Sequence, residues 1–313
     1  MARRSSVAPP ASAMVVGGAG FLGSHLVDRL VSEDVSVHVV DSMATGTLAN
    51  LATARRSGHD GRLSIQQLDA ATPEFADYVA RRRPSVVYLL AGLESWARGP
   101  MDAVLALGTF VNVLEAIRAG SPDSKLVFAV PGSLLYGDAP ARELPLKEDH
   151  ERRPIGVPGV VTQAMIDTAA AYRNDHGVEY TALALSTVYG PRLRPESNVV
   201  GAALAARADG RAFTLHGDGR QTRDFLFVDD CIDALWRTAT RGGGLLLNLG
   251  TGRQTAVRDL AGTIATDVGV VEAPRRPRSP SRVALSPSRA RLHLGWSPWT
   301  TLDEGLARCF AEG

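Results

Sequence analysis

Glycines cluster near the start of the chain, in the segment Gly17-Gly18-Ala19-Gly20-Phe21-Leu22-Gly23. The segment follows a short apolar run and precedes residues with helical periodicity, which is the context that makes such a motif informative. Gly17 permits a tight turn, Gly20 lets a phosphate approach the backbone, and Gly23 lets the helix pack closely. The free N–H groups and the positive dipole end of that helix favour phosphate binding.

A carboxylate follows the glycine turn at an informative distance. Asp41 closes the next apolar strand about 20 residues on, where a carboxylate accepts hydrogen bonds from an adenosine ribose. The turn and the carboxylate together predict a nicotinamide dinucleotide site. Asp41 favours NAD because it repels a 2′-phosphate, whereas Arg55 and Arg56 could reach such a phosphate unless they are ordinary solvated helix residues. The choice between NAD and NADP therefore stays open.

The elements that must position this site alternate between strands and helices. Short apolar runs predict strands, and 3.6-residue periodicity predicts helices. The alternation predicts an α/β fold with a doubly wound parallel sheet of the Rossmann type. Strands are expected over residues 14–17, 35–40, 63–68, 86–91, 125–130, 180–187 and 245–249, and helices over 21–31, 101–119, 160–176 and 200–207, with another helix ending over 78–83.

Two domains are expected in the 313-residue chain. Residues 14–190 and 225–250 are predicted to form the dinucleotide-binding domain, and residues 191–224 and 251–313 a smaller C-terminal substrate-binding domain. Residues 1–13 are expected to be a disordered leader. The segments 192–198 and 274–288 carry several Pro, Ser and Arg residues, so we expect them to form a lid that orders over bound substrate.

The composition weighs against several classes of protein. A hydrophobic content of 45% and a net charge of +1 are ordinary for a soluble globular protein and give no case for nucleic acid or membrane. Cys231 and Cys309 are too few for a disulfide framework or a cysteine metal site, and they suit a reducing cytoplasm. The seven histidines show no ligand spacing, so no metal is expected. No apolar run reaches the roughly 18 residues that span a bilayer.

Several further motifs lie along the chain. They are GGAGFLGSHLVDRL from Gly17, Asp69 at the end of the third strand, GTFVNVLEA from Gly108, Tyr136-Gly137, VYGPR from Val188, GDGRQTRDFLFVDD from Gly217, NLGTG from Asn248 and LGWSP from Leu294. In these motifs the chain resembles the extended short-chain dehydrogenase/reductases, the family of nucleotide-sugar epimerases and dehydratases. The resemblance implies that Arg223 either holds a nucleotide-sugar phosphate or serves as a structural partner of Asp224 or a carbonyl.

The resemblance also implies which residues surround the cofactor. Phe21 and Leu22 would cap the pyrophosphate, and Asp69 and Ala70 would border the adenine. The expected cofactor set is Gly17, Gly20, Phe21, Leu22, Gly23, Asp41, Ser42, Asp69, Ala70, Leu90, Ala91, Gly92 and Val130.

The catalytic residues of that family are absent. The family uses a Tyr-x-x-x-Lys pair, a Ser or Thr, and an Asn; its tyrosine protonates the carbonyl oxygen and its lysine lowers the tyrosine pKa. Alignment on the neighbouring motifs places Leu105 at the asparagine, Gly132 at the hydroxyl, Pro158 at the tyrosine and Thr162 at the lysine. No Tyr-x-x-x-Lys occurs between residues 131 and 175, so a small shift of the alignment cannot restore the pair.

Other side chains near these positions are candidates for contacts with a substrate. Ser133 is the best protein proton donor, although strand alternation could turn it away from the site. Tyr136 is expected to pack, His216 to be a plain loop histidine, and Trp96 either to stack on a flat substrate or to pack in the core. The expected substrate set is Ser95, Trp96, Gly132, Ser133, Tyr136, Pro158, Ser186 and Thr187.

These losses weigh against epimerisation and dehydration, which need proton transfers at several steps. A positioned acid or base contributes about 10²–10⁴ in rate. A single ketone reduction tolerates the loss better, because hydride transfer depends mainly on positioning. A pocket rebuilt with Leu105, Gly132 and Pro158 suits aromatic rings better than a sugar diphosphate.

The expected function is therefore an NAD(P)H-dependent ketoreductase. Its expected substrate is an aromatic polyketide of the angucyclinone type in antibiotic biosynthesis, with the proton supplied by the substrate or by solvent. The overall pattern is similar to that of actinomycete antibiotic-pathway reductases that lack the usual catalytic residues. Two alternatives stay open: a non-catalytic NAD(P)-binding sensor or scaffold, and a residual nucleotide-sugar epimerase or dehydratase. The protein is expected to be a monomer or a homodimer.

Overall fold

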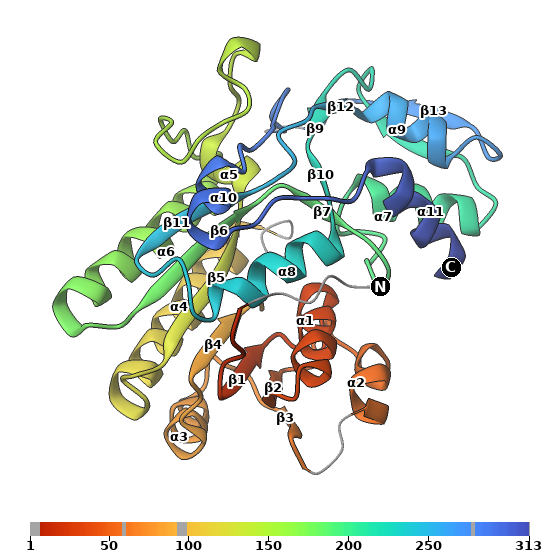
Figure 1. The fold of residues 1–313 in the computed structure, drawn as a ribbon. Coiled ribbons are helices and arrows are strands. Elements are labelled where there is room, and N and C mark those ends of the chain that lie inside the picture. The colour runs from red at the N-terminus through yellow and green to blue at the C-terminus, as the bar shows by residue number, and fades with distance from the viewer. Residues whose placement is uncertain (1–6, 58–60, 93–98, 277–278, 313) are drawn as a thin grey trace.

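A parallel sheet of seven strands forms the centre of the molecule (Figure 1). The computed structural model describes residues 7–57, 61–92, 99–276 and 279–312. All pairings within this sheet are parallel. In spatial order the strands are β11 (Leu245–Leu249), β6 (Tyr180–Leu185), β5 (Lys125–Pro131), β4 (Val86–Leu89), β1 (Ser12–Val16), β2 (Ser36–Asp41) and β3 (Leu63–Gln67).

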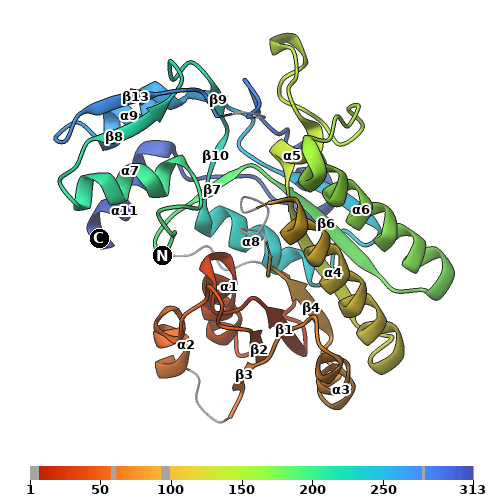
Figure 2. The ribbon, with the colours of Figure 1, turned by 180° about the vertical axis from the view of Figure 1, so that it is seen from behind.

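Helices cover both faces of the sheet, because successive side chains along each buried strand point to opposite faces. In β1, Ala13 and Val15 face one hydrophobic core, whereas Met14 and Val16 face the other. The predicted doubly wound α/β fold is therefore confirmed (Figures 1 and 2). One face carries α1 (Phe21–Ser32), α2 (Ala52–Ser57) and α8 (Val228–Thr238), and the other carries α3 (Pro73–Arg82), α4 (Pro100–Gly120) and α6 (Gly156–His176).

The remaining elements are shorter and gather mostly at one end of the sheet (Figure 1). Three two-stranded sheets pair β7 with β10, β9 with β12 and β8 with β13. Their strands are β7 (Thr187–Tyr189), β8 (Phe213–His216), β9 (Thr222–Arg223), β10 (Phe225–Phe227), β12 (Thr255–Ala256) and β13 (Val270–Ala273), and the helices are α5 (Gly132–Tyr136), α7 (Val199–Ala208), α9 (Val257–Ile264), α10 (Ser288–Leu294) and α11 (Leu302–Glu312).

The single strand expected over residues 180–187 is two strands. β6 ends at Leu185 within the large sheet, and β7 begins at Thr187 and pairs with β10. The backbone N–H of Ser186 still donates to Leu249 at 2.9 Å, whereas that of Thr187 donates to Asp224 at 2.9 Å. The chain thus passes from one sheet to another at Ser186.

The N-terminal segment is more ordered than the sequence indicated. β1 begins at Ser12, so the last two residues of the expected disordered leader belong to the sheet. Val7 is buried as well. Residues 1–6 of that leader lie outside the described residues.

Helix α4 is long and apolar enough to cross a membrane by length and composition alone, although no such segment was expected. It lies between α3 and α6 on one face of the sheet (Figure 2). Phe110, Leu114 and Ile117 are fully buried in the core beneath it. Burial over the sheet accounts for part of its apolar character, since a third of the apolar window is buried and Met101, Val104 and Leu105 are exposed.

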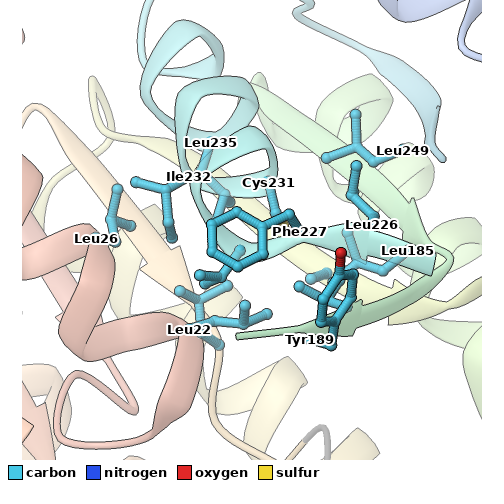
Figure 3. Close-up of a cluster of buried hydrophobic side chains, with 14 of the residues drawn as sticks. Leu22, Leu26, Leu185, Tyr189, Leu226, Phe227, Cys231, Ile232, Leu235 and Leu249 are labelled. Carbon is cyan, nitrogen blue, oxygen red and sulfur yellow. The ribbon is translucent and has the colours of Figure 1, made fainter. Parts of the chain in front are cut away.

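The core beside the glycine turn joins several elements (Figure 3). Leu22 and Leu26 of α1 pack with Ile232 and Leu235 of α8 and with Phe227 at the end of β10. Cys231 lies in the same cluster, and burial raises the pKa of its thiol to about 12. Both cysteines are buried. The helix that opens at the glycine turn is thus held in the same core as β7 and β10.

Candidate active site

A cleft of about 1170 Å³ lies at the carboxyl ends of the parallel strands. One side is lined by residues that follow β1, β2, β3 and β4, including the glycine turn. The other side is lined by α4, the 192–199 segment, β8 and four later residues, Arg275, Arg276, Ser279 and Val283. Ligands of open α/β sheets bind outside the carboxyl ends of the strands. The cleft therefore has a dinucleotide half and a substrate half.

The glycine turn has the shape that a dinucleotide requires. Gly17 has a φ of +82°, and a Cβ there would lie 2.6 Å from the backbone nitrogen of Ala91. A Cβ at Gly23 would collide with the carbonyl oxygen of Gly17. Gly20 caps α1 without a side-chain hydrogen bond, and the first turn holds no acidic residue. The free N–H groups at this end can therefore receive a pyrophosphate.

Asp41 holds the loop that borders the ribose side of the cleft. Its carboxylate is buried and accepts the backbone N–H groups of Ala19 and Met43, each at 2.8 Å. The loop is further tied to Ala19, whose carbonyl accepts the Asn50 side-chain amide at 2.8 Å and the Thr47 N–H at 3.1 Å. Thr45, Thr47 and Asn50 line the cleft but were not expected. Only the polar run after Asp41 could have indicated them.

The described structure places most of the expected cofactor residues on the cleft. Val130 was wrong: it faces the opposite core, and its neighbours Ala129 and Pro131 line the cleft instead, because side chains alternate along β5. Arg55 and Arg56 are exposed on α2 and do not line the cleft. The residues that line it are Gly17, Gly20, Phe21, Leu22, Gly23, Asp41, Ser42, Asp69, Ala70, Leu90, Ala91 and Gly92.

The four positions of the lost catalytic residues do not form a proton-transfer site. Thr162 is buried, and its hydroxyl donates to the carbonyl oxygen of Pro158 within α6 at 2.9 Å. Gly132 is buried at the start of α5, and neither it nor Pro158 lines the cleft. Leu105 lines the cleft with 62% of its surface exposed. No tyrosine or lysine is among the described residues that line the cleft.

The expected substrate residues divide into three groups. Ser133, Ser186 and Thr187 line the cleft. Tyr136, Gly132 and Pro158 were wrong as lining residues. The Tyr136 hydroxyl donates to Asn248 Oδ1 at 2.8 Å in a buried network, and burial raises the pKa of its phenol. Ser95 and Trp96 lie outside the described residues.

Ser133 and Ser186 follow neighbouring strands, since Pro131 of β5 is paired with Leu185 of β6. The Ser186 Oγ is buried and has no hydrogen-bond partner in the described part of the chain. Ser133 lines the cleft as well, although the alternation of side chains along the strand could have turned it away.

Arginines line the substrate half. Arg223 donates to the Thr222 carbonyl and to Ser279 Oγ, both at 2.7 Å, and burial lowers its pKa. Arg275 and Arg276 also line the cleft, and within the described ranges none of the three arginines forms an ion pair. In the sequence, only the Pro- and Arg-rich run after residue 273 indicated that Arg275 and Arg276 could belong to the site.

Asp224 is not the partner of Arg223. Its buried carboxylate accepts hydrogen bonds from the Thr251 N–H and hydroxyl, the Gly252 N–H and the Leu285 N–H. Burial raises the pKa of this carboxyl. Arg223 instead donates to the Thr222 carbonyl oxygen, as the structural alternative expected, and to the Ser279 hydroxyl, and neither contact neutralises its charge.

Metal and histidine chemistry find little support in the described residues. The described residues contain no group of three or more His, Cys, Asp or Glu side chains that could hold a metal ion. His216 lines the cleft, and its Nδ1 lies 3.1 Å from the Pro274 carbonyl oxygen.

Comparisons with known proteins show the family to which the chain belongs. Residues 13–250 match the model of the NAD dependent epimerase/dehydratase family. The chain is 34% identical to a UDP-glucose 4-epimerase of Mycolicibacterium smegmatis in an alignment 306 positions long, which covers 94% of this chain and 96% of the relative. It is 30% identical to a putative UDP-glucose 4-epimerase of Methanocaldococcus jannaschii, covering 94% of this chain and 96% of the relative.

Among solved structures, UDP-glucose 4-epimerases are again similar to this chain. A UDP-glucose 4-epimerase from Thermotoga maritima, solved with UDP-glucose, has a TM-score of 0.88 and 29% identity, covering 96% of this chain and 98% of that one. A Thermus thermophilus UDP-glucose 4-epimerase, solved with NAD, has a TM-score of 0.86 and 28% identity with the same coverage. The expected nicotinamide dinucleotide cofactor is thus confirmed at the level of the family, and the chain belongs to the NAD dependent epimerase/dehydratase family.

Proposed function

We propose that the chain is an NAD(P)H-dependent ketoreductase that works without a protein acid–base pair. The observation that carries this proposal is the combination of an intact dinucleotide half with a cleft whose described lining holds no tyrosine or lysine. Epimerisation and dehydration need a group that moves protons, whereas reduction of a ketone needs mainly two reactants held together.

The bound nicotinamide would supply the hydride. The N-terminus of α1 would hold the pyrophosphate, and the loop fixed by Asp41 would border the ribose. Apolar side chains from α4, α6 and β6 line the cleft beside the expected site of reaction; they include Leu105, Met165 and Leu185. The proton of the new hydroxyl would come from the substrate or from solvent, with Ser133 as the best candidate among the protein's hydrogen-bond donors.

An aromatic polyketide of the angucyclinone type is the substrate class that this chemistry favours. A phenol next to the carbonyl already donates an internal hydrogen bond, which stabilises the negative charge that develops on oxygen. In sequence the chain resembles reductases of actinomycete antibiotic pathways, such as the angucyclinone C-7 ketoreductase of simocyclinone biosynthesis. The relatives reported above act on sugar nucleotides by name, so this substrate class rests on the lost catalytic residues and the apolar lining.

The test is a cofactor-consumption assay with NADH and NADPH against aromatic ketones that do and do not carry an adjacent phenol. Stereospecific transfer of deuteride from labelled cofactor to the carbinol carbon is expected, and the phenolic ketones are expected to react faster. Ser133→Ala should retain most of the activity, because the substrate carries the stabilising donor. Absence of deuteride in every product would sink the proposal.

A second candidate is a residual nucleotide-sugar 4-epimerase. The relatives favour it, and so do Arg223, Arg275 and Arg276, whose charges suit a diphosphate. Calorimetry with UDP-glucose, repeated with Arg223→Met, separates the two candidates. Tight binding that this variant abolishes, with conversion of UDP-glucose to its C4 epimer, would favour the epimerase. Tight cofactor binding without any turnover would favour the sensor or scaffold.

Four further expectations stay proposals: the division into two domains, the lid, a cytoplasmic location, and a monomer or homodimer. The lid is the most direct to test, because residues 192–198 and parts of 274–288 line the substrate half. Slower amide hydrogen exchange in both segments when substrate is bound is the expected result. Equal exchange with and without substrate would contradict the lid.

A further inference from the structure

The segment between β7 and α7 lines the substrate half of the cleft, and its far end is fixed by one side chain. Asn198 caps α7 by accepting the N–H groups of Val200 and Gly201 at 2.9 and 3.3 Å. Its amide nitrogen also donates to the Val188 carbonyl oxygen at 2.8 Å. The C-terminal end of the segment is therefore fastened to the strand from which the segment departs.

The near end is fastened to α1, the helix that opens at the glycine turn. Arg192 Nη2 donates to Asp28 Oδ2 at 2.7 Å, and Nη1 donates to Ser24 Oγ at 3.1 Å. The two charged side chains are only 23% and 20% exposed, so solvent screens this pair less than a surface pair. Pro191 adds a third link, because its carbonyl oxygen lies 3.0 Å from His25 Nε2.

The state of His25 fits its role as a donor to that carbonyl. Burial lowers the pKa of the imidazole and, together with the nearby Arg192, outweighs the Pro191 hydrogen bond and the Asp28 and Asp229 carboxylates, which raise it. The ring is therefore neutral near pH 7, and an Nε2–H tautomer donates to the Pro191 oxygen. Ser24, His25 and Asp28 thus present one face of α1 to the start of the segment.

The backbone at Arg192 is strained. Its φ of +65° lies in the left-handed region, which a residue other than glycine rarely adopts. Such strain persists when the surrounding contacts determine the conformation, and it is common at binding sites. The contacts to Asp28 and Ser24 supply that determination here.

We propose that Arg192 is a positioning residue that holds the substrate side of the cleft in place against the cofactor helix. The inference rests on the proposed function and deepens it, since it names how the two halves of the same site are kept in register. Residues 193–197 lie between the two fastened ends and line the cleft. Loosening the Arg192 end should misplace the substrate while leaving the pyrophosphate end of α1 intact.

Asp28→Asn is the decisive variant, because Asp28 does not line the cleft and cannot touch substrate there. It is compared with Arg192→Met, with the conservative Arg192→Lys, and with Asp34→Asn, which removes the exposed ion pair between Asp34 and Arg62 as a matched control. Three quantities are measured: the cofactor Kd, the ketone KM and kcat, and hydrogen exchange of residues 193–197 with cofactor bound.

Asp28→Asn and Arg192→Met are expected to raise the ketone KM about tenfold, below the roughly 10²-fold that a 1 Å misplacement can cost. The cofactor Kd should stay within about twofold of the wild-type value, since the glycine turn is untouched. Exchange of residues 193–197 should be faster in both variants, and Arg192→Lys should recover part of both effects. Asp34→Asn should change none of the three quantities.

Two results would overturn the inference. If Arg192→Met raises KM and Asp28→Asn changes neither KM nor exchange, Arg192 acts by touching substrate directly. If Asp28→Asn weakens cofactor binding as much as ketone binding, α1 itself is damaged. A wild-type protein that reduces no ketone contradicts the proposed function alone; hydrogen exchange of the cofactor-bound variants then decides this inference, and unchanged exchange rejects it.

Discussion

The side chain of Leu285 occupies the space that a side chain at Gly132 would need. A Cβ at position 132 would lie 2.7 Å from Leu285 Cδ1 and 3.0 Å from the carbonyl oxygen of Leu185. Leu285 is itself fixed, because its N–H donates to Asp224 Oδ2 at 3.0 Å and it bridges to Leu146. The position of the family hydroxyl is therefore filled from another part of the chain.

Gly132→Ser is predicted to destabilise the protein without restoring an acid–base site. Overpacking of a buried position costs about 1–3 kcal/mol in unfolding free energy. Adding Leu285→Ala should reduce the cost of the serine, so that the two changes are less than additive in urea unfolding. Gly108→Ser is the control, since no atom lies within 4 Å of a Cβ there. A stable Gly132→Ser protein with faster ketone reduction would contradict this account.

Tyr136→Phe is predicted to lower stability and to leave turnover intact. The change removes the hydroxyl that donates to Asn248 Oδ1, and a buried acceptor left unpaired costs about 1–3 kcal/mol. Because Tyr136 does not line the cleft, kcat for a ketone should stay within about twofold. Denaturant unfolding and initial rates measure both effects, and a collapse of kcat in a folded variant would show that the phenol takes part in the reaction.

Asp41→Asn is predicted to weaken NADH binding by about tenfold or more, because hydrogen bonds to a charged group contribute about 1.5–3 kcal/mol. The amide cannot accept both the Ala19 and the Met43 N–H as the carboxylate does, so the loop loosens. NADPH should lose less, since repulsion of its 2′-phosphate is removed. Fluorescence titration measures the Kd of both cofactors, with Asp34→Asn as the control. An unchanged ratio of the NADH Kd to the NADPH Kd would argue against Asp41 as the residue that determines cofactor preference.

Lys125 is predicted to make stability depend on pH. Its ammonium is buried and donates to the carbonyl oxygens of Thr238 and Arg241, and burial lowers its pKa from 10.5 to about 8. Between these two values the unfolded chain binds more protons than the folded one, so the contribution of Lys125 to the unfolding free energy rises with pH. Below pH 8 no further change from this group is expected.

Comparison with Lys125→Met isolates the contribution of Lys125 to the pH dependence of the unfolding free energy. The variant removes the Lys125 donor from the Thr238 and Arg241 carbonyl oxygens and should be less stable at pH 7. The unfolding free energy of the wild type relative to the variant should increase from pH 8 to pH 10.5, as measured by urea unfolding at a series of pH values. A difference that is constant over this range would show that Lys125 keeps its ordinary pKa.

The dinucleotide half could be predicted because a recognisable motif reports its geometry. The glycine turn occupies consecutive residues, and Asp41 closes the next strand, where its carboxylate accepts the N–H of Ala19 within that turn. Val130 was wrong for a local reason: one step along β5 exchanges the two faces of the sheet, and because both faces carry apolar residues the sequence does not show which residues face the cleft.

The substrate half could not be predicted in the same way, because distant contacts decide it. The switch at Ser186 depends on Leu249 and Asp224, which are 63 and 38 residues further along the chain. Leu285 fills the space at Gly132 across an even longer separation. A sequence pattern shows that the family hydroxyl is lost, but only the packed structure shows what stands in its place.

The burial of both cysteines gives the protein a practical property. Cys231 is fully enclosed and its thiol stays protonated, and Cys309 is buried on α11. Thiol-directed reagents at neutral pH require an accessible thiolate. A single cysteine introduced at an exposed residue would therefore be the preferred attachment point for a fluorophore or spin label on the native fold, so movements of the cleft can be followed without first removing the natural thiols.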